Sequence, residues 1–283
     1  MNKNFYQSLS GKKIAISGST GGIGSALCEH ISALGGSIVC LDRNADKVAA
    51  LIKKVKKEHP HTTIEHIYMD LENPDSVKAA AEALKASGVD ILVLCAGAYH
   101  IPRRICAGGY DNIFQINFLA PYYLASIMKP FLETRGGRLV AVGSLSQVIA
   151  RLDETDPQGL KSRPAAAYGS AKLRLMLSLT RLFEGSDVLS LTHPGISPTG
   201  ITSGYPKFIR GIIKYPMRLI FMSPKKASIC VLRGIFLPTP KGSWMAPRVL
   251  GIWGRPRLAK MRSYSDVDAD TVSSQLENYL KSG

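Results

Sequence analysis

The chain has 283 residues, of which 45% are hydrophobic and 20% are charged, a composition typical of a globular protein with a sizeable core. No apolar run reaches the ~18 residues of a membrane-spanning helix, and no basic start followed by an apolar stretch indicates a signal peptide. The formal net charge is +15, and the absence of acidic residues between Asp187 and Asp266 makes that stretch attractive to anions. The five cysteines include no Cys-x-x-Cys pair, which favours free thiols in a cytoplasmic protein.

Apolar runs alternate with amphipathic patterns from the start of the chain to residue 192. Strands are expected at 13–17, 37–41, 64–69, 91–95, 138–143 and 188–192, and helices at 22–34, 45–58, 73–87, 110–133 and 165–184. Asn73 and Pro74 supply an N-cap and a first-turn proline for the third helix. The repeated strand–helix order predicts an α/β fold, a doubly wound parallel sheet with helices on both faces. No Pro/Gly/Ser-rich linker interrupts it, so residues 1–283 are predicted to form a single domain.

After Pro194 the pattern breaks into basic and apolar pieces separated by proline and glycine. Helices are expected from Ser223 onward and over 266–280, and residues 200–265 are interpreted as a basic, partly irregular lid region within the same domain. Three interpretations stay open for its segment 208–222, which mixes large apolar residues with arginine and lysine. They are a lid helix with a solvated basic face, a helix on a membrane surface, and a lid that grips an anionic substrate.

A glycine-rich turn, Gly18-Ser19-Thr20-Gly21-Gly22-Ile23-Gly24, joins the first expected strand to the first expected helix. In a parallel sheet this turn faces the ligand crevice, and its glycines let the backbone approach a pyrophosphate at the helix N-terminus. The candidate dinucleotide-binding residues here are Gly18, Ser19, Thr20, Gly22, Ile23 and Gly24. A tight turn without a ligand is the alternative interpretation.

Asp42 and Arg43 end the second expected strand, where the ribose of a dinucleotide would lie. A carboxylate accepts hydrogen bonds from a ribose diol and repels a 2′-phosphate, whereas an arginine attracts that phosphate or stacks on adenine. The carboxylate favours NAD as the cofactor, with NADP as the alternative. Asp70 and Leu71 follow the third strand, beside the expected position of the adenine amino group. A turn that leads into the next helix is the other role for Asp70.

Ser144, Tyr168 and Lys172 form a second cluster, far downstream. Tyr168 and Lys172 are four residues apart on an expected helix, so they share a face. A tyrosine with an ordinary pKa of ~10 is a poor base at neutral pH, and a nearby ammonium group favours its ionised form. Ser144 lies just past a strand end and can hold a substrate oxygen. The cluster predicts proton transfer to and from an alcohol oxygen.

Together with the glycine turn, this cluster resembles the short-chain dehydrogenase/reductase family over residues 10–200. The resemblance implies a Rossmann-type sheet with strand order 3-2-1-4-5-6-7, and dimers or tetramers. It assigns the acid/base role to Tyr168, substrate positioning to Ser144 and ribose binding to Lys172, with Asn117 supporting a water relay. It also implies cofactor contacts from residues that match further family motifs, namely Ala96, Gly97, Pro194, Gly195 and Thr199.

The sequence departs from the family pattern at two places. Cys95 stands where the family has an asparagine that ties the fourth strand to its neighbours. The interval from Ser144 to Tyr168 is longer than usual and holds a polar insertion around 153–162. This longer interval resembles the branch of retinol dehydrogenases and related carbonyl reductases, as does Gly108-Gly109-Tyr110 ahead of Asn117.

These features predict an NAD(P)-dependent oxidoreductase that interconverts an alcohol and a carbonyl by hydride transfer, with Tyr168 as general acid/base. The substrate is expected to be a small apolar or anionic molecule. The protein is expected to be a cytoplasmic homodimer or homotetramer with peripheral membrane contact through 207–222. A non-catalytic NAD(P)-binding regulator and a nucleotide-sugar epimerase-like enzyme remain as alternatives.

Two other classes of site are not expected. His59, His61 and His66 lie close together in the sequence, but no cysteine or paired carboxylate completes a metal site around them. The basic C-terminal stretch contains no recognition motif for nucleic acid, so specific nucleic-acid binding is not predicted.

Overall fold

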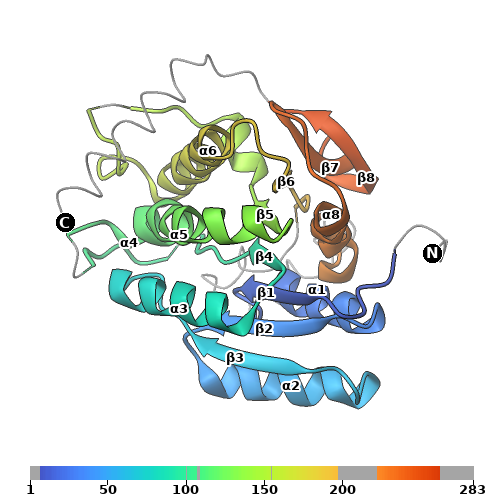
Figure 1. Ribbon diagram of the computed structural model, residues 1–283. Helices are drawn as coiled ribbons and strands as arrows, with labels where there is room; N and C mark the ends of the chain where they lie inside the picture. The colour runs from blue at the N-terminus through green and yellow to red at the C-terminus, as the bar shows by residue number, and fades with distance from the viewer. Residues whose placement is uncertain (1–6, 100, 107–108, 154, 197–221, 262–283) are drawn as a thin grey trace, which may run out of the picture.

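Seven parallel strands and one antiparallel strand form a single sheet across the described part of the molecule (Figure 1). The computed structural model describes residues 7–99, 101–106, 109–153, 155–196 and 222–261. The strands are β1 Lys13–Ser17, β2 Ser37–Asp42, β3 Ile64–Tyr68, β4 Ile91–Leu94, β5 Arg138–Val142, β6 Leu189–Thr192, β7 Ser243–Val249 and β8 Trp253–Lys260. Their spatial order is β3-β2-β1-β4-β5-β6-β7-β8. The predicted order 3-2-1-4-5-6-7 is therefore confirmed, and β8 extends the sheet beyond it.

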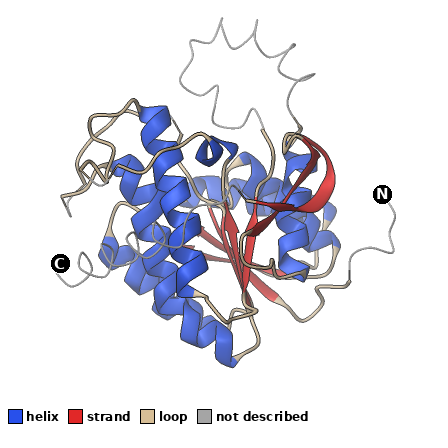
Figure 2. Ribbon diagram, turned by 90° about the horizontal axis from the view of Figure 1, so that it is seen from above, coloured by secondary structure: helices blue, strands red, loops and turns tan. Residues whose placement is uncertain are grey.

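Helices cover both faces of this sheet (Figure 2). They are α1 Gly22–Ala33, α2 Ala45–Glu58, α3 Pro74–Ser87, α4 Asn112–Phe114, η2 Gln115–Leu119, α5 Ala120–Thr134, η3 Leu145–Val148, α6 Pro164–Leu182 and α8 Pro224–Phe236. One apolar core joins α3, α5 and α6 to the sheet face that carries Ala15 and Leu92. The other joins α1, α2 and α8 to the opposite face, which carries Ile14 and Val93. Because the central strands are buried on both faces, they are apolar throughout rather than alternating.

Two asparagines cap helices in the structure, Asn73 as predicted and Asn44 in addition. Oδ1 of Asn73 accepts hydrogen bonds from the backbone N–H groups of Asp75 and Ser76, and Pro74 occupies the first turn of α3. Oδ1 of Asn44 accepts one from the N–H of Lys47 at the start of α2. These caps satisfy N–H groups that a helix leaves without an internal partner, so α2 and α3 begin at fixed points behind β2 and β3.

The helix expected over 110–133 starts later and is not uniform. Asp111 is its N-cap, accepting hydrogen bonds at Oδ1 from the N–H groups of Ile113 and Phe114. A π-helical turn, η2, then separates α4 from α5. Within η2, the side-chain amide of Asn117 donates to the carbonyl of Ile113 at 2.8 Å. A side chain that donates to a helix carbonyl competes with the regular backbone hydrogen bonds of the helix. The periodicity of apolar residues does not reveal such an interruption.

The region expected to be partly irregular contains a regular hairpin. After α8, strands β7 and β8 pair antiparallel, with Pro247 opposite Pro256 and a register shift near Val249. Proline removes a ladder donor and argues against a strand in a sequence, so local patterns predicted neither strand, and a seventh strand was expected only from the family resemblance. The pairing tolerates both prolines because β8 is the edge of the sheet and β7 meets β6 in register only at Thr192 and Met245.

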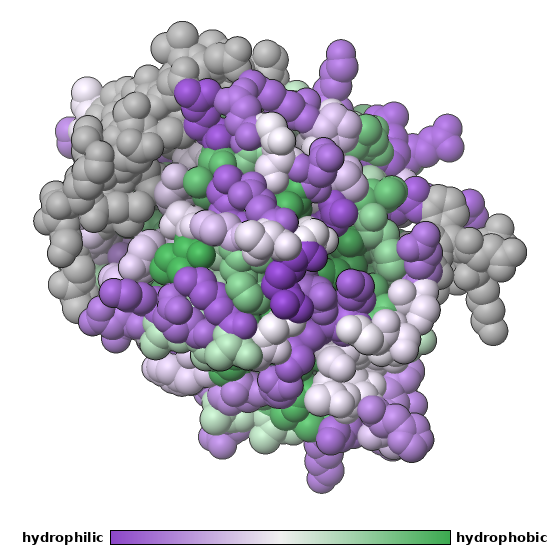
Figure 3. Space-filling view, in the orientation of Figure 1, coloured by the Kyte–Doolittle hydropathy of each residue, from purple (hydrophilic) through white to green (hydrophobic). Residues whose placement is uncertain are grey.

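Although residues 222–261 of the predicted lid region are described, two predicted features nearby fall outside the described residues. This applies to segment 207–221 and to the helix expected over 266–280, whereas the helix expected from Ser223 is present as α8. On either side of the gap, the N–H of Met222 donates to the carbonyl of Ile196 at 3.1 Å. No helix in the described ranges is both long and apolar enough to cross a membrane. Figure 3 shows hydrophilic side chains over much of one face, with smaller apolar areas between them.

Candidate active site

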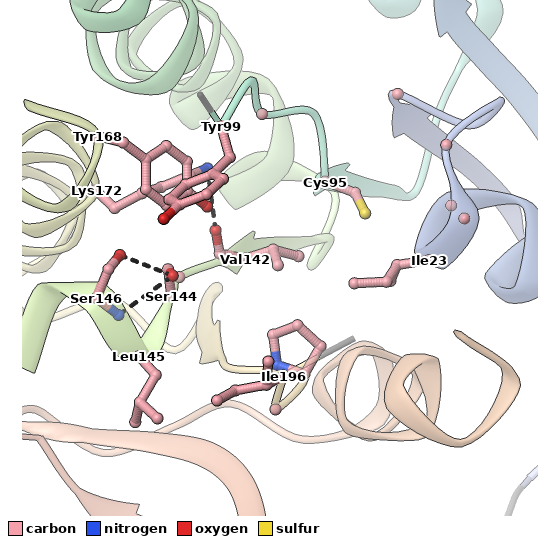
Figure 4. A pocket seen from close by; sticks show the side chains of 18 of the residues that line it. Ile23, Cys95, Tyr99, Val142, Ser144, Leu145, Ser146, Tyr168, Lys172 and Ile196 are labelled. Carbon is pink, nitrogen blue, oxygen red and sulfur yellow. Dashed lines mark hydrogen bonds between the residues drawn. The ribbon is translucent and has the colours of Figure 1, made fainter. Parts of the chain in front are cut away.

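A cleft of about 700 Å³ opens at the carboxyl ends of the central strands (Figure 4). Its walls come from the glycine turn after β1, the segment after β4, the start of η3 after β5, the middle of α6 and the segment after β6. Of the predicted site residues, it brings together Gly18, Gly22, Ile23, Gly24, Gly97, Ser144, Tyr168, Lys172, Pro194 and Gly195. Thr199 lies outside the described residues. In a doubly wound sheet this edge, where the strand order reverses, is where ligands bind.

The glycine turn is packed too tightly for side chains at two of its positions. Gly18 has φ +68°, and a Cβ there would lie 2.8 Å from the Cα of Ala96. A Cβ on Gly24 would collide with the carbonyl of Gly18 and the backbone of Ser19. Helix α1 then begins at Gly22, with Gly21 at the N-cap position, no side-chain cap and no acidic residue in its first turn. Its free N–H groups and bare backbone form a cradle suited to a pyrophosphate.

A smaller cavity of about 290 Å³ continues from the cleft, sharing Gly18, Gly21, Cys95 and Gly97 with it. Its other lining includes the predicted adenine-side residues, namely Thr20, Asp42, Arg43, Asp70, Leu71 and Ala96. The two spaces therefore run from the β3 side of the sheet past the glycine turn to Tyr168. Such a trough has the connectivity that an extended dinucleotide requires.

Asp42 is buried and turned toward the glycine turn. Its carboxylate accepts hydrogen bonds from the N–H and the hydroxyl of Ser19, at 2.9 and 2.5 Å, and from the hydroxyl of Thr20, at 2.8 Å. Ser19 is fully buried, so the structure places its side chain against Asp42. Asp42 thus fixes the shape of the glycine turn while its carboxylate still lines the smaller cavity.

Arg43 lies in an ion-pair network that the sequence did not indicate. Its Nη1 is 3.0 Å from Oε1 of Glu72 and 3.6 Å from Oδ1 of Asp70. The other oxygen of Glu72 receives Nη2 of Arg104 at 2.5 Å. Glu72 also lines the smaller cavity. Arg104 is far away in the sequence, in the segment after β4, so no local pattern links it to Arg43.

Tyr168, Ser144 and Lys172 meet at the other end of the trough. Burial raises the pKa of Tyr168 to about 12, and a hydrogen bond with the Ser144 hydroxyl opposes that rise. Burial lowers the pKa of Lys172 to about 8. The ammonium group of Lys172 donates to the carbonyls of Ala96 and Val142, both at 3.3 Å. Lys172 therefore holds a positive charge beside the strand ends, in contact with both walls of the cleft.

Asn117 and Lys172 both approach Gly97. A Cβ at Gly97 would lie 3.0 Å from Oδ1 of Asn117 and 3.3 Å from Nζ of Lys172, so glycine is what lets them come close. The Asn117 amide is fully buried and exchanges hydrogen bonds with the backbone N–H and carbonyl of Ala98, at 3.1 and 3.0 Å. Asn117 thus holds the segment after β4 in place behind the cleft.

Ser17 ties the end of β1 to the segment after β4, where Cys95 stands in place of the family's asparagine. Its hydroxyl, at the end of β1, accepts hydrogen bonds from the N–H groups of Cys95 and Ala96, both at 3.1 Å. Cys95 itself lines the cleft, and burial raises the pKa of its thiol to about 12. Replacement of the asparagine therefore leaves the β1 and β4 ends joined.

Several lining residues were missed by the sequence analysis. Tyr99 meets Tyr168 edge to face, with ring centroids 5.1 Å apart and planes at 87°. The rest of this wall is largely apolar and comprises Val142, Leu145, Val148, Ile149 and Ile196, with Ser146 among them. Ser146 donates to the Ser144 hydroxyl from both its N–H and its own hydroxyl. Of these residues, only Ser146 could have been suspected from the sequence, because it lies two residues after the candidate Ser144.

The polar insertion before α6 is anchored by one arginine. The guanidinium of Arg103 donates to the carbonyls of Gly159, Leu160 and Ser162, at 2.6 to 3.0 Å, and its Nε lies 3.2 Å from Oδ2 of Asp111. The insertion is thereby docked on the segment between β4 and α4. It adds a fixed outer wall to the fold near the start of α6.

Comparison with known proteins agrees with this arrangement. Residues 12–152 match the family model of the short chain dehydrogenases. Human polyprenol dehydrogenase is 29% identical over 200 residues, which cover 66% of this chain and 61% of that protein. Human retinol dehydrogenase 13 is 27% identical over 198 residues, which cover 67% of this chain and 60% of that protein. The match spans less than two thirds of the length of either relative.

Among solved structures, L-sorbose reductase from Gluconobacter frateurii, complexed with NADPH and L-sorbose, aligns with a TM-score of 0.60 at 22% identity. The alignment covers 82% of this chain and 91% of that chain. At this level of identity the likeness shows the fold. Together with the family match and the strand order, it shows that this chain belongs to the short-chain dehydrogenase/reductase family, in the retinol dehydrogenase-like branch that its sequence resembles.

Proposed function

We propose that this chain is an NAD(P)-dependent oxidoreductase that interconverts an alcohol and a carbonyl, with Tyr168 as the general acid/base. The observation that carries the proposal is the meeting of Tyr168 and Ser144 in a cleft that is continuous with the glycine cradle. A proton-transfer group and a dinucleotide-sized trough at one strand edge are the two requirements of hydride chemistry on an alcohol.

The residues present fit a nicotinamide dinucleotide. The start of α1 after Gly21, which has no side-chain cap, suits the pyrophosphate, and Asp42, Asp70 and Leu71 border the adenosine end. Lys172, Pro194 and Gly195 border the opposite end, beside Tyr168. When bound, the nicotinamide supplies the hydride acceptor or donor, which no side chain of the protein provides.

The chain's own residues would hold and move one proton at the hydroxyl oxygen of Tyr168. With a pKa of about 12, Tyr168 keeps this proton at neutral pH and is suited to donate it to a carbonyl oxygen. The Ser144 hydroxyl lies in hydrogen-bonding contact with Tyr168 and can orient the same substrate oxygen. The protonated amine of Lys172, one helical turn on, favours the tyrosinate that remains after transfer.

An apolar substrate suits the walls of the cleft. Leu145, Val148, Ile149 and Ile196 line the outer part, and the described residues place no charged side chain there other than Lys172. Burial of apolar substrate surface against such walls is favourable by about 25 cal/mol per Å². We therefore expect a hydrophobic aldehyde, ketone or alcohol rather than a sugar.

The test combines binding and turnover. We expect NADH fluorescence to report saturable binding, and NADH oxidation to require a hydrophobic carbonyl from a panel of alkyl and prenyl aldehydes and ketones. Saturable binding with no turnover on any member would favour the non-catalytic regulator. Failure to bind either NADH or NADPH would overturn the proposal.

Three further expectations accompany it. We propose a single dinucleotide-binding domain, a homodimer or homotetramer, and a cytoplasmic location with membrane contact through 207–222. Size-exclusion chromatography with light scattering and vesicle co-sedimentation test the last two.

A further inference from the structure

Glu72 is the fixed centre of a charge cluster at the adenosine end of the trough. It follows β3 by a short turn, and its side chain is 11% exposed, whereas those of Arg43 and Arg104 are 58% and 57% exposed. One carboxylate oxygen pairs with Arg43 and the other with Arg104. The thiol of Cys106 donates weakly to the second oxygen, at 3.7 Å.

The backbone around Glu72 is held as firmly as its side chain. The N–H of Glu72 donates to Oδ1 of Asp70 at 3.0 Å, and the next residue, Asn73, caps α3. Arg43, in contrast, extends a long, exposed side chain from the end of β2. Glu72 is therefore the less exposed and more constrained partner of this ion pair.

NAD and NADP differ by one phosphate on the adenosine ribose. The smaller cavity, where this ribose would lie, is lined by three carboxylates, those of Asp42, Asp70 and Glu72, and by one guanidinium, that of Arg43. The N–H donors of an arginine bind a phosphate in charge-assisted pairs, so Arg43 is the lining residue suited to a 2′-phosphate. In this structure Nη1 of Arg43 is directed at the carboxylates of Glu72 and Asp70.

We infer that Glu72 favours NAD over NADP in this chain, by holding the Arg43 guanidinium in an ion pair and away from a 2′-phosphate. The inference rests on the proposed function, because it concerns the nucleotide that the trough accepts. It assigns a specificity role to a residue in the turn after β3, in addition to the residues at the end of β2. Glu72 acts through Arg43 and does not need to touch the nucleotide.

The experiment is a double-mutant cycle read by nucleotide binding. Dissociation constants for NADH and NADPH are measured by fluorescence titration for the wild type, Glu72→Gln, Arg43→Ala and the double variant. Glu72→Gln keeps the side-chain shape and removes its charge, so Arg43 loses its nearer carboxylate and keeps only the longer contact with Asp70. We expect NADPH affinity relative to NADH to rise ~10-fold or more, as for one gained charge-assisted contact. In the Arg43→Ala background the same substitution should change the ratio at most ~2-fold.

Arg104→Ala is the matched control. It removes the other partner of Glu72 but leaves the Arg43 pair, so the NADPH to NADH ratio should stay near that of the wild type. An equal gain from Glu72→Gln with and without Arg43 would overturn the inference, since it would show a direct field effect of the carboxylate. An unchanged ratio would also overturn it.

Arg43→Ala alone keeps the inference testable if Glu72→Gln does not fold. A held Arg43 contributes little to NADPH binding, so its loss should change NADPH affinity less than ~3-fold. A loss of NADPH affinity beyond ~10-fold, with NADH binding intact, would show that Arg43 already reaches the phosphate and would sink the inference. If the wild type binds neither nucleotide, the proposed function fails instead.

Discussion

Oδ2 of Asp42 accepts hydrogen bonds from both the backbone N–H and the hydroxyl of Ser19, at 2.9 and 2.5 Å. This pair joins the end of β2 to the glycine turn after β1, and the two elements together form the cradle. Asp42 is therefore more than a carboxylate that would meet a ribose. It sets the position of the backbone that would meet the pyrophosphate.

We predict that the wild type binds NADH more tightly than NADPH and that Asp42→Ala weakens both by ~10-fold or more, because the turn loses its charge-assisted acceptor. Fluorescence titration of both nucleotides measures this. Ser19→Ala, which removes only one of the bonds, should weaken both by a smaller factor. Tighter NADPH binding to Asp42→Ala would show that charge repulsion, rather than loop shape, is the main effect.

We predict that Tyr168→Phe lowers kcat by ~10²-fold or more while the dissociation constant of NADH stays within a few-fold, because only the proton-carrying oxygen is removed. Tyr99→Phe is the matched control, since Tyr99 lines the same cleft and packs on Tyr168. It should keep most of the activity. Retention of more than about a tenth of kcat by Tyr168→Phe would remove Tyr168 from the acid/base role.

We predict that Gly24→Ala abolishes nucleotide binding or prevents folding, because its Cβ would overlap the carbonyl of Gly18. Gly21→Ala is the comparison, since a Cβ there would lie 3.2 Å from the same carbonyl and needs only a small shift. Its effect on binding should be clearly smaller. Thermal unfolding and NADH titration of both variants test whether Gly24→Ala has the larger effect. Equal effects of the two substitutions would contradict the packing argument.

We predict that His193 makes the protein less stable in acid. It is 1% exposed, stacks on Trp244 with centroids 4.9 Å apart, and burial lowers its pKa to about 4, against the backbone groups of Gly251 and Gly143. Between this pKa and the ordinary value of ~6.5, the unfolded chain binds more protons than the folded one. The contribution of neutral, buried His193 to the free energy of unfolding is therefore complete above pH ~6.5 and is lost as pH falls toward ~4.

Urea unfolding of the wild type and of His193→Phe over this pH range measures the effect. The variant keeps an aromatic ring against Trp244 and has no group that titrates. Between the two pH limits, the free energy of unfolding of the wild type should fall by up to roughly 3 kcal/mol more than that of the variant. Parallel stability curves for the two proteins would show that His193 is not buried in its neutral form.

The sequence by itself determined the elements of the sheet through β6, their parallel arrangement and the two clusters of the site, whereas the strand order followed from the family resemblance. These depend on local patterns: apolar strands, the asparagine cap at Asn73, and glycines at a strand–helix turn. Local patterns involve only residues that are close in the sequence, so they can be recognised without knowledge of the fold.

Only the tertiary structure decided which side chains oppose one another across long sequence distances. Arg104 pairs with Glu72, Arg103 binds the insertion, Tyr99 packs on Tyr168, and Asp42 turns to Ser19. The β7–β8 pairing was equally hidden, because its prolines are unfavourable in an isolated strand and acceptable only at this edge of the sheet. Contacts of this kind form when the sheet brings distant segments to one edge, and a single sequence carries no periodic signal for them.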